Sequence, residues 1–316
     1  MNNNIAIIIP AFRGEFLYET LSSLANQNYK NFNVYIGDDC SPDDIEKISQ
    51  QFNDLLNIKY KRFDYNLGGK NLVDHWNRCL TMIQNEEWFQ FFSDDDVLDS
   101  NCIYNLNEAI NREDFDVFRF ELKIIGRNNE LVDLPQSYPT KLSALDFYKK
   151  LYSNEITARM PEFVFRTSNF KDLGGFVDFP MAMRSDNATV IKCAFTKGIY
   201  SISNNFVGWR DTGYNVSRRS SNKLINLIQF QALLSFFEWI SKFCDMKNVS
   251  NPLSNSAISK FVIKDAFELY KKVGLKHLIE SVNDNEYFSR KKLNLFFGLI
   301  RFIMDKSYHK VIRIIK

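Results

Sequence analysis

Three consecutive aspartates, Asp94, Asp95 and Asp96, directly follow the aromatic and apolar run Trp88–Phe92. Adjacent carboxylates repel one another, and a divalent cation relieves that repulsion. Hard ions such as Mg²⁺ and Mn²⁺ take carboxylate oxygens and keep substrate phosphate oxygens as further ligands. The pattern therefore indicates a metal site. The alternative is a solvated acidic turn in which Asp96 or Asp99 caps the next helix.

A second acidic pair, Asp38 and Asp39, follows the apolar run Phe32–Ile36 in the same manner. A carboxylate at the end of a strand can accept hydrogen bonds from a ribose or from the N–H group of a base. The alternative is again a turn and cap, because Ser41 and Pro42 have the form of a helix start.

Other chemistries lack their residues. No Gly-x-Gly-x-x-Gly follows the first apolar run, residues 68–70 lack the spacing of a phosphate loop, and no Gly-x-Ser-x-Gly occurs. The histidines, His75, His277 and His309, are scattered, and the five cysteines include no Cys-x-x-Cys pair. A site for an anionic ligand then needs another positive charge, which a carboxylate-held metal supplies.

Five apolar runs separated by helical patterns position these residues. They are Ile5–Ile9, Phe32–Ile36, Asn57–Phe63, Trp88–Phe92 and Phe115–Phe120. Runs that are apolar at every position are typical of strands buried on both faces. Their alternation with helices predicts an α/β fold with a doubly wound, mainly parallel sheet. Ligands in such folds bind at the carboxyl ends of the strands, where both acidic groups fall.

The last hundred residues have a different character. Long helical patterns rich in phenylalanine cover Leu224–Cys244, Ile258–Val273 and Arg290–Met304. We therefore expect a catalytic domain over residues 1–218 and a C-terminal helical appendage over residues 219–316. The chain has 316 residues, 45% of them hydrophobic and 25% charged, which suits one large globular domain with an appendage.

Positive charge gathers at the C-terminus. The net charge is +2, but residues 286–316 hold eight basic and two acidic side chains. Their helices either pack on the catalytic domain or dock on an anionic membrane surface or partner. Met1–Asn4 lacks the positive start of a signal peptide, and no apolar run approaches the roughly 20 residues of a membrane span. These features predict a cytoplasmic protein, with peripheral contact at the inner face of the membrane as an alternative.

Seven segments together carry a family resemblance, in the family's order and over about residues 4–217. They are Ile5–Phe12, Leu21–Gln27, Phe32–Ser41, Asn66–Gly68, Phe91–Asp96, Leu173–Phe176 and Ser185–Asp186. The chain resembles a family-2 glycosyltransferase with the GT-A fold, of the non-processive type found in bacterial surface-polysaccharide synthesis. It departs from the pattern at Ser93, where an Asp is common, and at Cys40, where a Gly is common.

The resemblance implies roles for these residues. The nucleotide-sugar site would be formed by Pro10, Ala11, Phe12, Asp38, Asp39, Asn66, Lys70 and Asp94. Asp95 and Asp96 would hold Mn²⁺ or Mg²⁺, although the register of metal ligation among the three aspartates stays open. Asp186 would be the general base, whereas without the resemblance it reads as a helix N-cap.

The resemblance implies an inverting, metal-dependent enzyme. It would move one sugar from a nucleotide-diphosphate sugar, most commonly a UDP-sugar, to a carbohydrate or lipid-linked acceptor in surface-glycan synthesis. The Gln-x-x-Arg-Trp motif of processive members is absent, which favours single-sugar addition. The alternatives are a sugar-1-phosphate nucleotidyltransferase and a non-catalytic binding module. No nucleic-acid-binding motif is found, and the oligomeric state is not readable from the sequence.

Overall fold

The structure is a computed structural model that describes residues 4–213, 215, 221–289 and 298. The chain divides into two compact units. The first contains residues 1–178 and 185–215, and the second contains residues 179–184 and 216–316. The division at residue 216 lies close to the boundary expected at residue 218, but the short segment 179–184 belongs with the C-terminal helices.

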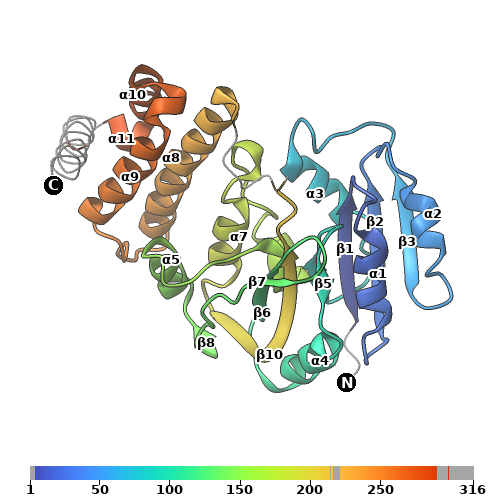
Figure 1. Cartoon of the computed structure of the whole chain (residues 1–316). Helices are drawn as coiled ribbons and strands as arrows, with labels where there is room; N and C mark the ends of the chain where they lie inside the picture. Colours follow the sequence, from blue (N-terminus) through green and yellow to red (C-terminus); the bar gives the residue numbers. More distant parts are fainter. Residues whose placement is uncertain (1–3, 214, 216–220, 290–297, 299–316) are drawn as a thin grey trace, which may run out of the picture. The chain divides into compact units, whose positions relative to one another are not determined.

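A ten-stranded sheet forms the centre of the first unit, with strand order β3-β2-β1-β4-β9-β6-β10-β5. The parallel half contains β1 (Ile5–Ala11), β2 (Phe32–Asp38), β3 (Asn57–Arg62) and β4 (Trp88–Phe91) (Figure 1). The other half contains β5 (Val97–Leu98), β6 (Val117–Ile125), β9 (Phe163–Arg166) and β10 (Ile199–Arg210). Short strands β7 (Leu131–Asp133) and β8 (Lys141–Leu142) pair with β6 and β10.

The predicted α/β fold is confirmed, but this second half of the sheet is mixed. β9 runs antiparallel to both β4 and β6, while β6 and β10 are parallel. It follows that β1, β2, β4, β6 and β10 all point the same way. Their carboxyl ends share one edge, and the start of β9 lies at that edge. We call it the carboxyl edge.

Helices cover both faces of the sheet. They are α1 (Leu17–Ala25), α2 (Ile45–Gln50), α3 (Leu72–Leu80), α4 (Cys102–Arg112), α5 (Ala144–Tyr152), α6 (Thr167–Asp172) and α7 (Ser185–Cys193). Apolar residues of α1 and α4 form one buried cluster with β1 and β2. On α3, Val73 and Cys79 are buried, and this helix packs on β1 and β2. The N-cap of α2 is Asp44 and not the expected Ser41, because Ser41 Oγ donates to Phe12 O at 2.6 Å.

The second unit is helical, as the sequence predicted. It contains a short 3₁₀ turn (Pro180–Ala182), α8 (Lys223–Met246), α9 (Asn255–Val273), α10 (Leu275–Asp284) and α11 (Glu286–Ser289). Phenylalanines of α8 are buried, and Phe237 contacts Phe261 and Phe288. Of the basic segment, residues 286–316, expected either to pack on the catalytic domain or to dock on an anionic surface, only residues 286–289 and 298 are among the described residues.

One described helix, α8, is long and apolar enough to cross a bilayer by length and composition. This corrects the expectation that no apolar stretch approaches that length. Half of its apolar window is buried in the structure, as in many core helices, so the evidence for a membrane span is weak.

Candidate active site

The three adjacent aspartates at the carboxyl edge have three different environments. Asp94 Oδ2 accepts hydrogen bonds from the backbone N–H groups of Phe12 at 2.8 Å and Arg13 at 2.9 Å. Asp96 is fully buried, and its Oδ1 accepts from the backbone N–H of Arg210 at 2.8 Å. Asp95 is half-buried, and its carboxylate accepts no hydrogen bond from any other described residue. Asp94 therefore anchors the loop after β1, and Asp95 is the most available ligand.

Negative charge at this motif is poorly compensated. Burial, reinforced by Asp96 and Asp94, raises the pKa of Asp95 to about 9. Burial likewise raises the pKa of Asp96 to about 7. The buried Asp96 Oδ2 also has no hydrogen-bond partner within the described ranges of the chain. A cation would stabilise the ionised carboxylates and satisfy that oxygen, so these residues fit a divalent metal.

In the described part of the chain, no three His, Cys, Asp or Glu side chains converge into a complete metal cage. A complete cage is not required. Mg²⁺ is commonly held by one or two carboxylates, with substrate phosphates and water filling its remaining positions. The carboxylates of Asp95 and Asp96 fit a site of that kind, and a metal there stays a prediction.

Arg210, at the end of β10, holds the acidic motif in place. The side chain is completely buried and stacks on Phe16, with its guanidinium carbon 4.4 Å from the ring centre. Its guanidinium donates to Asp95 O (2.7 Å), Gly126 O (3.1 Å), Arg127 O (3.0 Å), Glu19 Oε2 (2.8 Å) and Asn129 Oδ1 (2.8 Å). Arg210 thus joins α1, the loop after β6 and the acidic motif.

We expect Arg210→Met to lower the free energy of unfolding by about 3–5 kcal/mol, the usual cost of removing one partner from a buried ionic network. The apolar side chain would leave three backbone carbonyls, all buried or partly buried, and the carboxylate of Glu19 without this donor. Urea denaturation measures the change. Arg112→Met, on an exposed side chain of α4, is the control and should change stability by less than about 0.5 kcal/mol. A loss below 1 kcal/mol for Arg210→Met would contradict this role.

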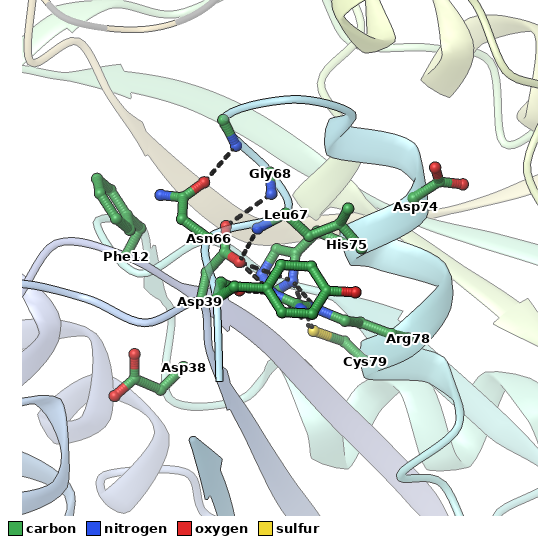
Figure 2. A network of polar contacts seen from close by, with 12 residues as sticks. Phe12, Asp38, Asp39, Asn66, Leu67, Gly68, Asp74, His75, Arg78 and Cys79 are labelled. Atoms are coloured by element: carbon green, nitrogen blue, oxygen red, sulfur yellow. Dashed lines mark hydrogen bonds and ion pairs between the residues drawn. The ribbon is translucent and has the colours of Figure 1, made fainter. Parts of the chain in front are cut away.

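The paired aspartates at the end of β2 accept hydrogen bonds from neighbouring backbone and side-chain groups. Asp38 is completely buried and accepts from Ser41 N (2.8 Å), Tyr60 Oη (2.6 Å) and Arg62 Nη1 (2.7 Å). Asp39, 2% exposed, accepts from the backbone N–H groups of Leu67 (2.7 Å) and Gly68 (2.8 Å) and from Arg78. Figure 2 shows Asp39 at the centre of this network, between β2 and α3. Direct contact of Asp38 or Asp39 with a nucleotide stays a prediction.

The loop that precedes α3 is shaped by Asp39. A Cβ atom at Gly68 would lie 2.6 Å from Asp39 Oδ2, so this close approach requires glycine. Asn66 Oδ1 accepts from Gly69 N at 2.5 Å and closes the turn. Lys70 is exposed beside this turn and forms no ion pair with a described residue. An unpaired ammonium at this edge suits the predicted contact with phosphate.

Arg78 and His75 are functional candidates that the sequence did not single out. Arg78 pairs with Asp39 and donates from Nε to His75 Nδ1 at 2.9 Å (Figure 2). Its guanidinium carbon also lies 4.0 Å from the centre of the Phe63 ring. Burial lowers the pKa of His75 to about 4, so the ring is neutral. Because Nδ1 accepts, the ring proton is on Nε2, 3.7 Å from Cys79 Sγ. Their spacing in the sequence could have identified them. His75 and Arg78 are three residues apart in the predicted helix, so they lie on one face together with Cys79.

The loop after β1 lies between the two acidic groups. Pro10 and Ala11 pair with Gly37 and Asp38 in the parallel ladder, and Ala11 is completely buried. Phe12 is 38% exposed. Of these three residues of the predicted nucleotide-sugar site, Phe12 therefore presents the most surface.

Asp186 is far along the chain from the two acidic groups. It lies half-buried in the first turn of α7, one residue after the helix begins. Its Oδ1 accepts from the backbone N–H of Asn187 at 2.7 Å. The preceding residues Met181, Ala182 and Arg184 have φ values of 57°, 54° and 68°, in the left-handed region that L-residues rarely adopt. Strained backbone of this kind is frequent at functional sites.

Comparison with known proteins identifies the family of the chain. Residues 6–179 match the sequence profile of the family described as glycosyl transferase family 2. The chain belongs to glycosyl transferase family 2. The glycosyltransferase predicted from the sequence is thereby confirmed, and the nucleotidyltransferase alternative is set aside.

Relatives of this glycosyltransferase include the poly(ribitol-phosphate) β-N-acetylglucosaminyltransferase TarS of Staphylococcus aureus strains Mu50 and MW2. Each is 29% identical over 185 residues, which cover 57% of this chain and 30% of the relative. The glycosyltransferase chain thus spans less than a third of their length.

Solved structures of S. aureus TarS share the fold. Residues 1–349 of TarS in complex with UDP-GlcNAc align with a TM-score of 0.59 at 20% identity, over 89% of this chain and 80% of that one. A longer TarS structure aligns with a TM-score of 0.58 at 19% identity, over 89% of this chain and 48% of that one. At this identity the likeness establishes the GT-A-like fold of the glycosyltransferase.

Proposed function

We propose that this glycosyltransferase moves one sugar, with inversion, from a UDP-sugar to a hydroxyl of a carbohydrate, polyol-phosphate or lipid-linked acceptor. The observation that carries the proposal is Asp95 at the carboxyl edge, whose half-buried carboxylate accepts no hydrogen bond from another described residue. The TarS relatives, named for N-acetylglucosamine transfer to poly(ribitol phosphate), support UDP-N-acetylglucosamine as the first donor to test.

The nucleotide would lie over the ends of β1 and β2. Phe12 offers an aromatic surface for the base, and the turn from Asn66 to Lys70 offers backbone and an ammonium for ribose and phosphate. Asp95 and Asp96 would hold Mn²⁺ or Mg²⁺. When bound, the cation would neutralise charge that develops on the leaving diphosphate.

The chemical step needs one base from this chain. The acceptor oxygen forms a bond to the anomeric carbon as the bond from that carbon to the diphosphate oxygen breaks. The acceptor proton passes to a carboxylate oxygen of Asp186, which we assign as the general base. The diphosphate leaves with the electron pair, and the sugar configuration inverts. We place the reaction in the cytoplasm, within surface-glycan synthesis.

The decisive experiment combines turnover and binding. The full chain is incubated with Mn²⁺ and UDP-N-acetylglucosamine, UDP-glucose, UDP-galactose or GDP-mannose, and release of nucleoside diphosphate is measured. In parallel, the thermal midpoint is measured with each nucleoside diphosphate, with and without Mn²⁺. UDP at a hundredfold excess over its dissociation constant should add about 2.7 kcal/mol of stability. A midpoint shift that requires UDP and Mn²⁺ together supports the proposal, and no shift with any nucleotide would refute it.

A further inference from the structure

Arg159 and Trp209 form a cation–π pair in the first unit. The guanidinium carbon of Arg159 lies 4.7 Å from the centre of the Trp209 ring, and both side chains are half-buried. Arg159 precedes the 3₁₀ turn Met160–Glu162, and Trp209 is the second-last residue of β10. A stacked Arg–Trp pair that reaches solvent offers both a positive charge and an aromatic edge.

In the described part of the chain Arg159 forms no ion pair within 4.0 Å, and its electrostatic partner, Glu162, is already paired with Arg119. Other arginines of the same unit have carboxylate partners within 4.0 Å, among them Arg119 with Glu162, Arg166 with Asp116, and Arg210 with Glu19. Among the residues that the structure describes, the guanidinium of Arg159 donates only to Ala158 O at 2.8 Å, and its buried Nε has no partner. The nearby Glu162 accepts instead from the backbone N–H of Arg159, at 2.7 Å. A partly desolvated, unpaired guanidinium favours an anionic ligand.

The strand topology places this pair beside the acidic motif. Gln90 of β4 lies opposite Val164 of the antiparallel β9, so residues before Phe163 extend past the end of β4, toward Asp94–Asp96. Gln90 Nε2 donates to Pro161 O at 2.6 Å and fixes this position. Next to Trp209, Arg210 bonds directly to Asp95 and Asp96.

Asp186 lies at the same edge. Asn169 of α6 donates a hydrogen bond to the backbone oxygen of Cys193, the last residue of α7. Helix α6 follows the end of β9 that is opposite to the carboxyl edge. The chain then enters β10 at Ile199, at the opposite edge of the sheet. The first turn of α7, with Asp186, is therefore directed toward the carboxyl edge, where Arg159 and Trp209 lie.

Inversion sets the side from which an acceptor must approach. The attacking hydroxyl and the leaving diphosphate lie on opposite sides of the anomeric carbon. If the nucleotide occupies the β1, β2 and α3 half of the edge, the acceptor approaches from the β9, β6 and β10 half. Arg159 and Trp209 belong to that half.

We propose that Arg159 and Trp209 form an acceptor subsite that binds a phosphate group carried by the acceptor chain. The guanidinium would pair with the phosphate, and the indole would contact the adjoining sugar or polyol carbons. This subsite rests on the proposed function above. It selects a phosphate-bearing acceptor over a neutral glycan. The phosphate belongs either to a polyol-phosphate polymer or to the diphosphate of a lipid-linked sugar.

The test compares three acceptors in wild type and Arg159→Gln: an oligo(ribitol phosphate), an alkyl-diphosphate-linked sugar, and a neutral oligosaccharide of similar length. Arg159→Gln should raise the KM of the preferred phosphate-bearing acceptor by about 10- to 100-fold, the range for loss of a hydrogen bond between charged groups. The donor KM should stay within about twofold. Arg159→Lys should recover part of the loss, and Trp209→Ala should raise the acceptor KM while the donor KM stays constant.

Arg166→Gln is the matched control, because Arg166 stacks on Trp88 at 4.4 Å but pairs with Asp116 at the other end of β4. It should leave every acceptor KM unchanged. Thermal midpoints of all variants with UDP and Mn²⁺ show whether they fold and bind nucleotide. An unchanged acceptor KM in Arg159→Gln would overturn the subsite.

Calorimetric binding of the same three acceptors separates the subsite from the proposed function. If wild type binds neither phosphate-bearing acceptor while nucleotide release proceeds, the subsite is overturned and the proposed function stands. If no donor is turned over, the proposed function fails. Binding of a phosphate-bearing acceptor that Arg159→Gln weakens would then still support the subsite, and binding that Arg159→Gln leaves unchanged would overturn it.

Discussion

Asp186→Asn should lower kcat by about 10²- to 10⁴-fold, the range for losing a general base. Asparagine keeps the size of the side chain and an oxygen for the backbone N–H of Asn187, but it cannot take the acceptor proton. Affinity for UDP and Mn²⁺ should stay within about twofold. Steady-state release of UDP measures the rate, and the thermal shift with UDP and Mn²⁺ measures binding.

The control for this variant is Asp172→Asn, an exposed carboxylate at the end of α6, which should retain wild-type kcat. If Asp186→Asn retains more than about a tenth of the wild-type kcat, another group accepts the proton and our assignment is wrong. Loss of the UDP and Mn²⁺ thermal shift would instead indicate that Asp186 supports the nucleotide site.

Asp95→Asn should have two opposite effects. A neutral amide is a poor metal ligand, so kcat should fall by about 10³-fold, a metal being worth several kcal/mol to the transition state. The thermal shift that needs both UDP and Mn²⁺ should disappear. The same substitution removes a carboxyl that the folded protein must keep protonated at a pH where the unfolded chain ionises it, so the metal-free protein should gain stability at pH 8.

The pH dependence of stability follows from the pKa of Asp95, raised from 3.8 to about 9 in the folded chain. Folding favours the protonated carboxyl, so this contribution is fully present below about pH 4 and is lost as pH rises through 9. Asp95→Asn should flatten the decline in metal-free stability across that window, as measured by urea denaturation at several pH values.

Asp99→Asn is the control for Asp95→Asn. Asp99 lies in the same segment but pairs with Lys123 at 2.5 Å. It should keep the metal-dependent thermal shift and most of the activity. If Asp95→Asn keeps the metal-dependent thermal shift, Asp95 is not the metal ligand, and the ligand is Asp94 or Asp96.

The N-terminal half of the fold was readable because its strands are parallel and buried on both faces. Such strands are continuous apolar runs, and β1 to β4 begin at the predicted residues. β10 was missed because the polar residues Ser203, Asn204 and Asn205 interrupt its pattern. The structure shows a register shift between Ile202 and Phe206 at that point, and a bulge allows the strand to continue.

The sequence by itself determined the chemistry available, namely carboxylates at the ends of two buried strands in a chain without a phosphate loop or nucleophile motif. Only the tertiary structure distinguished Asp94, Asp95 and Asp96, because adjacent identical side chains differ only in the partners that reach them. Those partners, Phe12 and Arg210, are distant in sequence. The burial of Arg210 and the unpaired charge of Arg159 were likewise decided by segments that meet only on folding.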